Sequence, residues 1–222
     1  MDSKAPLVIS ISRQLGCGGS YLGQKLADQF QLLYLDKEIL KQVSDKFGIS
    51  SGNLEWREER IVSNWLTIIN LISSLNPQIS LPYLDYTIPS VPIYLSNEDL
   101  FKAESEIILK VASEKPSVFI GRGSSSILKD HPKHVSIFLH AEKPFRLENV
   151  QRSYGVTSNE ARRIIDLTDK SRARFVREQT GADMNDATQY DLCLDTGVIG
   201  LEKSFEVIKS YIIERFNPVQ QK

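Results

Sequence analysis

The stretch Leu7–Ala27, LVISISRQLGCGGSYLGQKLA, decides which fold is expected for this chain. Leu7–Ser12 is an apolar, β-branched run of strand length, and Arg13–Gly19 contains three glycines in four residues. Tyr21–Gln31 then places apolar residues at helical spacing. A buried strand that turns through glycines into a helix presents backbone N–H groups and the positive helix end to an anion. The stretch therefore predicts a phosphate-binding loop.

The loop departs from the established nucleotide-binding patterns. In G-x-x-x-x-G-K-[ST], the Lys reaches the β- and γ-phosphates and the hydroxyl residue holds Mg²⁺. Here Gly19 or Ser20 stands at the Lys position, depending on the alignment, and Ser20 or Tyr21 follows. A G-x-G-x-x-G pattern also fails, because its third glycine would be Tyr21. The loop alone therefore leaves open a purely structural turn between strand and helix.

Composition indicates an ordinary globular protein. The 222 residues suit one large domain, or a domain with a smaller insertion, and 41% of them are apolar and 25% charged. A net charge of −1 gives no electrostatic reason to expect nucleic-acid or membrane binding. Cys17 and Cys193 form no metal-ligand pair and indicate reduced thiols in a cytoplasmic protein. No apolar run reaches membrane-spanning length, and we expect no metal bound by the protein alone.

Strand and helix patterns alternate over most of the chain, which predicts a parallel sheet covered on both faces. The polar, glycine-flanked turns should then lie at one edge of that sheet. Beyond the first strand and helix, the predicted strands are Leu32–Leu35, Ser117–Ile120, Val135–Leu139 and Leu192–Leu194, and the predicted helices are Lys37–Phe47, Asn97–Glu114, Pro144–Tyr154, Ser158–Thr180 and Leu201–Phe216.

Residues 49–96 differ in kind from the rest, and we interpret them as an insertion. Leu54–Leu75 is a long helical pattern that is polar at its start and apolar afterwards. Prolines between Pro77 and Pro92 alternate with tyrosines, which indicates irregular structure. The apolar half could pack on the main domain, form a homodimer surface or touch a membrane. The cationic face of a membrane-surface helix is missing, which favours burial and leaves homodimer packing open.

Five motifs in order carry a resemblance to a known family: ISISRQLGCGGSYLGQKLA, YLDKEIL, VFIGRGS, SRARFVREQTG and YDLCLDTGVIG. Together they resemble the cytidylate kinase-like proteins, a branch of the P-loop nucleoside monophosphate kinases. The resemblance runs from residue 7 to about 213 and is weakest in 49–96. It implies a three-layer α/β/α fold with about five parallel strands. The kinase core would be 1–48 and 97–222, with a helical lid at about 155–188 and an acceptor-side insertion at 49–96.

The resemblance also implies an activity and its cofactors. Such kinases transfer the γ-phosphoryl group of Mg·ATP to a nucleoside monophosphate such as CMP or dCMP. The protein's task is positioning and positive charge around the transferred group. By matching motif, the donor phosphates would meet Ser12, Arg13, Gly16, Cys17, Gly18, Gly19, Ser20 and Tyr21; the acceptor would meet Asp36 and Arg122; and the lid would supply Arg172, Arg174, Arg177 and Asp169, the last to orient the arginines.

Several of these residues have a structural interpretation as well. Asp36 follows a strand and precedes a helix, so it is either an N-cap or a carboxylate facing ligand at the sheet edge. Arg122 lies between two glycines at a strand end, where a guanidinium has little to pack against, which favours a functional role. Arg172 and Arg174 are two positions apart and do not share a helix face, so both reach one ligand only if the lid bends or wraps it.

The missing loop cation leaves two hypotheses. The cytidylate kinase-like branch commonly has Arg immediately after the double glycine, where this chain has Ser20. Arg13, just before the loop, or a lid arginine could replace that charge. The first hypothesis is a small-molecule kinase. The second is a nucleotide-binding regulatory or assembly protein with little kinase activity.

Overall fold

Five parallel strands form the centre of the protein. The computed structural model describes residues 5–37, 39–40 and 97–216. In this part of the chain, the strands form one sheet in the order β2-β3-β1-β4-β5. Every neighbouring pair is parallel, so the carboxyl ends of all strands lie at one edge. The strands are β1 (Val8–Arg13), β2 (Leu33–Leu35), β3 (Ser117–Ile120), β4 (His134–His140) and β5 (Leu192–Asp195).

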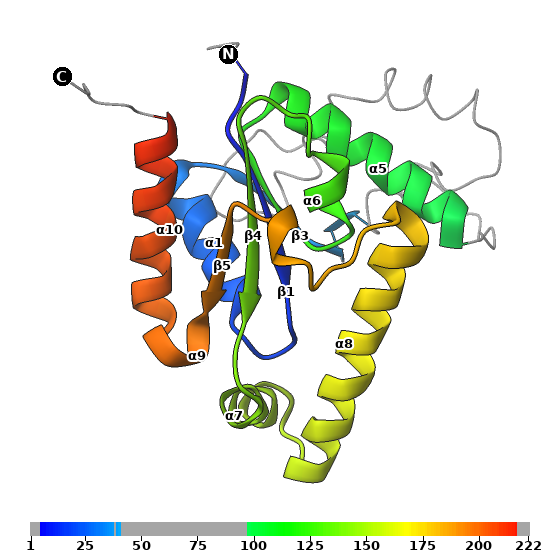
Figure 1. Ribbon diagram of the computed structural model, residues 1–222, viewed down its shortest axis with the longest axis vertical. Helices are drawn as coiled ribbons and strands as arrows, with labels where there is room; N and C mark the ends of the chain where they lie inside the picture. Colours follow the sequence, from blue (N-terminus) through cyan, green and yellow to red (C-terminus); the bar gives the residue numbers. More distant parts are fainter. Residues whose placement is uncertain (1–4, 38, 41–96, 217–222) are drawn as a thin grey trace, which may run out of the picture.

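Helices cover both faces of this sheet, which confirms the predicted three-layer α/β/α fold (Figure 1). Figure 1 shows α1 and α10 on one side, α5, α6 and the long α8 on the other, and α7 beyond the carboxyl ends of the strands. The helices are α1 (Gly19–Phe30), α5 (Asn97–Glu114), α6 (Ser124–Ile127), α7 (Lys143–Tyr154), α8 (Ser158–Thr180), α9 (Thr196–Ile199) and α10 (Leu201–Phe216), with a 3₁₀ turn at Ala187–Gln189.

The central strand β1 shows why the sequence selects this fold. Its apolar residues are fully buried, because helices cover both sides of the sheet and no alternation with polar residues is needed. Both serines of the strand, Ser10 and Ser12, are buried as well, and Ser10 is fully so. The Ser10 hydroxyl lies 2.7 Å from His134 Nε2 and 2.9 Å from Ser125 Oγ, so its hydrogen-bonding capacity is satisfied inside the core.

Most predicted boundaries hold within one or two residues, and the bounds predicted for α5, β3, α8 and α10 match the structure. The strand β1 continues through Arg13, so this residue is the last of the strand rather than the first of the loop. The helix α1 begins at Gly19, two residues earlier than predicted. A capping box between Thr157 and Glu160 fixes the start of α8.

The proposed insertion at 49–96 lies outside the described residues, and so does most of the helix predicted for Lys37–Phe47, of which Lys37, Ile39 and Leu40 are helical. The division into core and insertion therefore remains a prediction. Among the residues that the structure describes, no helix is long and apolar enough to cross a membrane.

Candidate functional site

The turn from β1 to α1 has the backbone of an anion-binding loop. Gly16 and Gly18 adopt left-handed conformations, with φ of 85° and 82°. Gly18 is the N-cap of α1 and no side chain caps the first turn of this helix. The first N–H groups of a helix have no intrahelical partner, so this turn offers its donors and the helix dipole to an anion. The backbone agrees with the phosphate-binding loop that the sequence predicts.

Cys17 is a buried residue of the loop and stabilises the loop conformation. Its thiol is fully buried and donates hydrogen bonds to the carbonyl oxygens of Gln14, at 3.0 Å, and Leu139, at 3.5 Å. Burial raises the pKa of the Cys17 thiol to about 11, so it is neutral and a poor nucleophile. Cys17 therefore contributes packing and hydrogen bonds rather than a reactive thiol.

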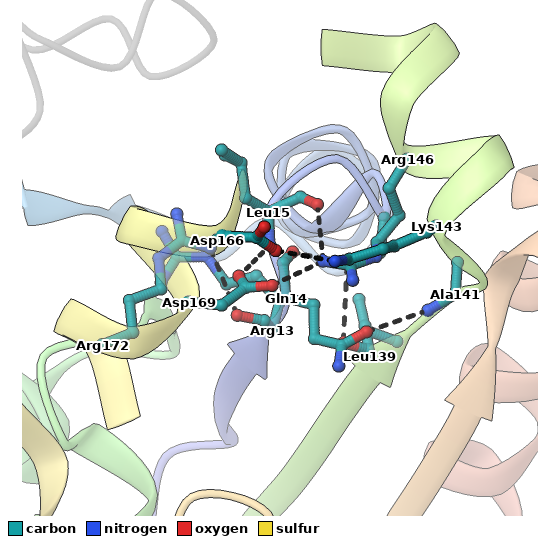
Figure 2. A network of polar contacts seen from close by, with 11 residues as sticks. Arg13, Gln14, Leu15, Leu139, Ala141, Lys143, Arg146, Asp166, Asp169 and Arg172 are labelled. Carbon is teal, nitrogen blue, oxygen red and sulfur yellow. Dashed lines mark hydrogen bonds and ion pairs between the residues drawn. The ribbon is translucent and has the colours of Figure 1, made fainter. Parts of the chain in front are cut away.

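Two helices after β4 fasten the loop from the other side (Figure 2). The backbone N–H of Leu15 donates to Asp169 Oδ1 on α8 at 2.8 Å, and Asp169 Oδ2 pairs with Arg146 Nη1 on α7 at 2.5 Å. The same Arg146 nitrogen donates to the Leu15 carbonyl at 3.3 Å, and the Asn149 amide donates to the Gly16 carbonyl at 2.8 Å. The conformation of the loop is thus fixed by side chains more than 130 positions away in the chain.

The role predicted for Asp169 needs correction. The sequence suggested that it orients the lid arginines, but its carboxylate binds Arg146 and the loop backbone instead. Arg172, one turn further along α8, donates to the Arg13 carbonyl at 3.2 Å. Arg177 is largely exposed, and its nearest carboxylate is that of Asp183, at 3.6 Å. The acid therefore positions the loop, and the arginines are placed by the helix itself.

A cavity of about 870 Å³ lies between the loop, the turn after β3 and α8. Ser12 and Ser20 line it on the loop side, and Phe175 lines it from α8. Among the described residues, the lining contains one acidic side chain, Glu178, against five cations. Such an excess of positive charge favours an anionic ligand. The five cations are Arg13, Lys37, Arg122, Arg172 and Arg174.

Arg172 and Arg174 both reach this cavity although α8 is continuous from Ser158 to Thr180. The sequence suggested that residues two apart could share a ligand only if the lid bent. The helix does not break, and both arginines line the same cavity.

Arg122 occupies a constrained position after β3. It has a φ of 58°, between Gly121 at 76° and Gly123 at 70°. For a residue with a side chain, this left-handed conformation costs about 1–2 kcal/mol. The Arg122 guanidinium pairs through Nε and Nη2 with the buried carboxylate of Glu104 and stacks 4.3 Å from the centre of the Phe175 ring. No pattern in the sequence indicates the role of Glu104, because an acidic residue within a helical pattern is expected to be exposed to solvent.

Asp36 and Tyr21 can also be placed. Asp36 Oδ1 accepts a hydrogen bond from the N–H of Ile39 at 3.0 Å, so the N-cap interpretation of Asp36 is observed. The Tyr34 hydroxyl hydrogen-bonds both Asp36 and Ser20, which brings a carboxylate and a hydroxyl together beside the loop. Burial raises the pKa of Tyr34 to about 12. Tyr21 does not line the cavity, and its hydroxyl donates to Glu202 on α10; its place among the phosphate-binding residues stays a prediction.

Comparisons with known proteins agree with this geometry. The family model described as "Cytidylate kinase-like family" matches residues 8–198. A cytidylate kinase from Methanopyrus kandleri is 30% identical over 120 residues, and the match spans 49% of this chain and 62% of that protein, less than two thirds of its length. The crystal structure of an uncharacterized protein from Eubacterium ventriosum has the same fold, with a TM-score of 0.67 and 21% identity over 93% of this chain and 98% of that one. The chain belongs to the cytidylate kinase-like family.

Proposed function

We propose that this protein is a nucleotide kinase that transfers the γ-phosphoryl group of Mg·ATP to a pyrimidine nucleoside monophosphate such as CMP or dCMP. The observation that carries the proposal is the cationic cavity, where the phosphate loop, the turn around Arg122 and the arginines of α8 meet. Phosphoryl transfer asks the protein to hold two phosphate groups in line and to surround the transferred group with positive charge. Membership of a kinase-like family supports a phosphotransferase at that coarser level.

The described residues divide into three roles. The backbone of Gly16–Ser20, at the start of α1, would bind the donor phosphates, Arg172 and Arg174 would contact the transferred phosphoryl group, and Arg122 and Asp36 would face the acceptor. Of these residues, Ser20, Arg122, Arg172 and Arg174 line the cavity. Because Glu104 already uses the Nε–Nη2 edge of Arg122, an acceptor phosphate would meet the remaining edge or compete with that carboxylate.

The surroundings of the loop fit a magnesium ion that arrives with the nucleotide. Such an ion is typically held by one or two protein oxygens, several waters and the phosphates. Ser20 and Asp36 share the Tyr34 hydroxyl and could supply those oxygens. The ranges described here contain no group of three or more acidic, His or Cys side chains that could hold a metal without a nucleotide. When bound, Mg²⁺ would neutralise phosphate charge.

The alternative is a nucleotide-binding regulatory or assembly protein with little kinase activity. The absence of a Lys from the loop favours it, because Gly19 or Ser20, depending on the alignment, stands where a phosphate loop normally carries Lys. ADP release from Mg·ATP against a panel of nucleoside monophosphates separates the two functions. We expect turnover with CMP or dCMP that Arg174→Ala abolishes, while Arg162→Ala, an exposed arginine on the same helix, leaves it unchanged. ATP binding without turnover on any acceptor would overturn the kinase and leave the alternative.

A further inference from the structure

The side chain of Arg13 occupies the space that two glycines leave empty. A Cβ atom built on Gly19 would lie 2.8 Å from Arg13 Cγ, and one built on Gly121 would overlap Arg13 Nη1. The Arg13 side chain therefore runs from the end of β1, past the first residue of α1, to the turn that follows β3. The contact at Gly19 involves the Cγ and Cβ atoms of Arg13, which cannot move away without moving the strand end, whereas the contact at Gly121 involves the end of the side chain, so a Cβ there would displace the guanidinium group.

The sheet topology explains this path. The strand β1 pairs with β3 in the register Ile11↔Ile120, so Gly121, the first residue after β3, follows this register next to Ser12 and close to Arg13, the last residue of β1. The other contact is with Gly19. In one of the two possible alignments, Gly19 stands where a standard phosphate loop carries its Lys. In this protein the stem of Arg13 fills the volume next to the backbone from which that Lys would extend. The charge thus reaches the cavity from the opposite end of the loop.

The surroundings of Arg13 are suited to an anion. The side chain lines the cavity, and Arg172 donates to the backbone carbonyl of Arg13 from α8. Burial, followed by the charge of Arg172, lowers the pKa of Arg13 to about 10, so Arg13 is still cationic at neutral pH. Within residues 5–37, 39–40 and 97–216, no carboxylate forms an ion pair with Arg13. Two neighbouring guanidinium groups in a cavity are stabilised by an anion placed between them.

We propose that Arg13 is the loop cation of this protein: its guanidinium binds the terminal phosphates of the donor nucleotide and the group being transferred, and positions 19 and 121 are glycine so that this side chain can pass. The catalytic part of this inference rests on the proposed kinase function. The phosphate-binding part does not rest on it, because that part concerns only the affinity of the protein for a nucleoside triphosphate.

Moving the positive charge from position 13 to position 19 tests this role of Arg13. Arg13→Gln should lower kcat by a factor on the order of 10²–10³, the usual effect of removing one donor that stabilises the transition state. Gly19→Lys alone should also be nearly inactive, because the new side chain collides with Arg13. In the double variant Arg13→Ala/Gly19→Lys, removal of the Arg13 Cγ takes away the closest contact and the Lys restores the charge, so kcat should rise at least about tenfold above that of Arg13→Ala. The exposed Arg163→Gln serves as the control for loss of a cation.

Binding measurements distinguish failure of this inference from failure of the kinase function. Calorimetry should show that Arg13→Gln loses affinity for ATP about tenfold or more and keeps its affinity for AMP, which lacks both terminal phosphates. Arg13→Lys, which retains the charge and should fold, should stay close to the wild type in ATP binding. If the wild type turns over no acceptor but this ATP-specific loss is seen, the kinase proposal fails and the role of Arg13 stands. Unchanged ATP affinity in Arg13→Gln, or a double variant no better than Arg13→Ala, would overturn the inference.

Discussion

The carboxylate of Asp169 on α8 accepts a hydrogen bond from the backbone N–H of Leu15 in the phosphate loop, at 2.8 Å. The same side chain pairs with Arg146, whose side chain is only 7% exposed (Figure 2). One residue of α8 thus binds the backbone of the loop and compensates the charge of a buried arginine. The loop and α8 are therefore connected directly by side-chain contacts.

Asp169→Ala should destabilise the protein by about 2–3 kcal/mol, because removal of one partner leaves a buried charge uncompensated, and the partial exposure of Asp169 reduces the full penalty. Urea unfolding followed by circular dichroism gives this quantity. Asp166→Ala is the matched control on the same helix, since its pair with Lys143 is exposed and its loss should not be measurable. Equal effects of the two substitutions would contradict this account of the loop.

Gly16→Ala should destabilise the protein by about 2–3 kcal/mol through overpacking and a strained backbone. The new Cβ would lie 2.7 Å from the backbone oxygen of Arg146, and the φ of Gly16 is 85°. Gly155→Ala is a control for the strain alone, because its φ is 65° and a Cβ there meets nothing within 4 Å. We expect thermal unfolding to show a clearly larger loss for Gly16→Ala, together with weaker ATP binding that Gly155→Ala does not cause.

Glu104→Ala should cost about 3–4 kcal/mol and should also raise the KM for the acceptor, because Arg122 loses the carboxylate that orients it. Glu104 is 1% exposed, so its partner would be left with an uncompensated charge in a nearly dry position. Glu114→Ala, on the same helix, removes a half-exposed pair with Lys110 and should change both quantities far less. An unchanged KM in Glu104→Ala would separate Arg122 from acceptor binding.

Acid should destabilise the protein through His134. Burial lowers the pKa of His134 to about 4, below its ordinary value near 6.5. The unfolded chain therefore binds a proton more readily than the folded one between these values. The contribution of His134 to stability is complete above pH 6.5 and is lost progressively as the pH falls towards 4. Between pH 7.5 and 5, the free energy of unfolding should fall by about 2 kcal/mol from this residue.

His134→Gln isolates this contribution, because Gln can still hydrogen-bond the hydroxyl of Ser10 but does not titrate. The pH dependence of the variant should be flatter over the same interval by about that amount. A variant whose stability falls as steeply as that of the wild type would show that other groups, such as His131, dominate the response.

Local patterns in the sequence were sufficient for the layers of the fold and for the backbone of the loop. Apolar runs of strand length, glycines in the first turn and periodic helices depend on residues near one another, so they can be read without coordinates. Even the ends of α5, α8 and α10 follow from local composition.

The partners within the site could not be read in this way. Arg146 lies among many arginines, and only the structure shows that it is buried against Asp169. Glu104 looks like a solvated acid of α5, yet it holds Arg122. Tyr21 occupies a position associated with Mg²⁺ binding but turns towards α10. In each case, the deciding contact joins segments far apart in the chain, and periodicity carries no information about such contacts.

The position of β1 at the centre of the sheet has a consequence for synthesis. Val8 pairs with Ser117 and His134, so among the described strands β1 has no neighbour until more than a hundred further residues have been made. During that interval, the apolar side chains and unpaired backbone groups of β1 are open to association with other chains. Contacts of such high sequence separation also slow folding. The chain should therefore depend on chaperones early in translation, and a truncated product that ends before β3 should aggregate rather than fold.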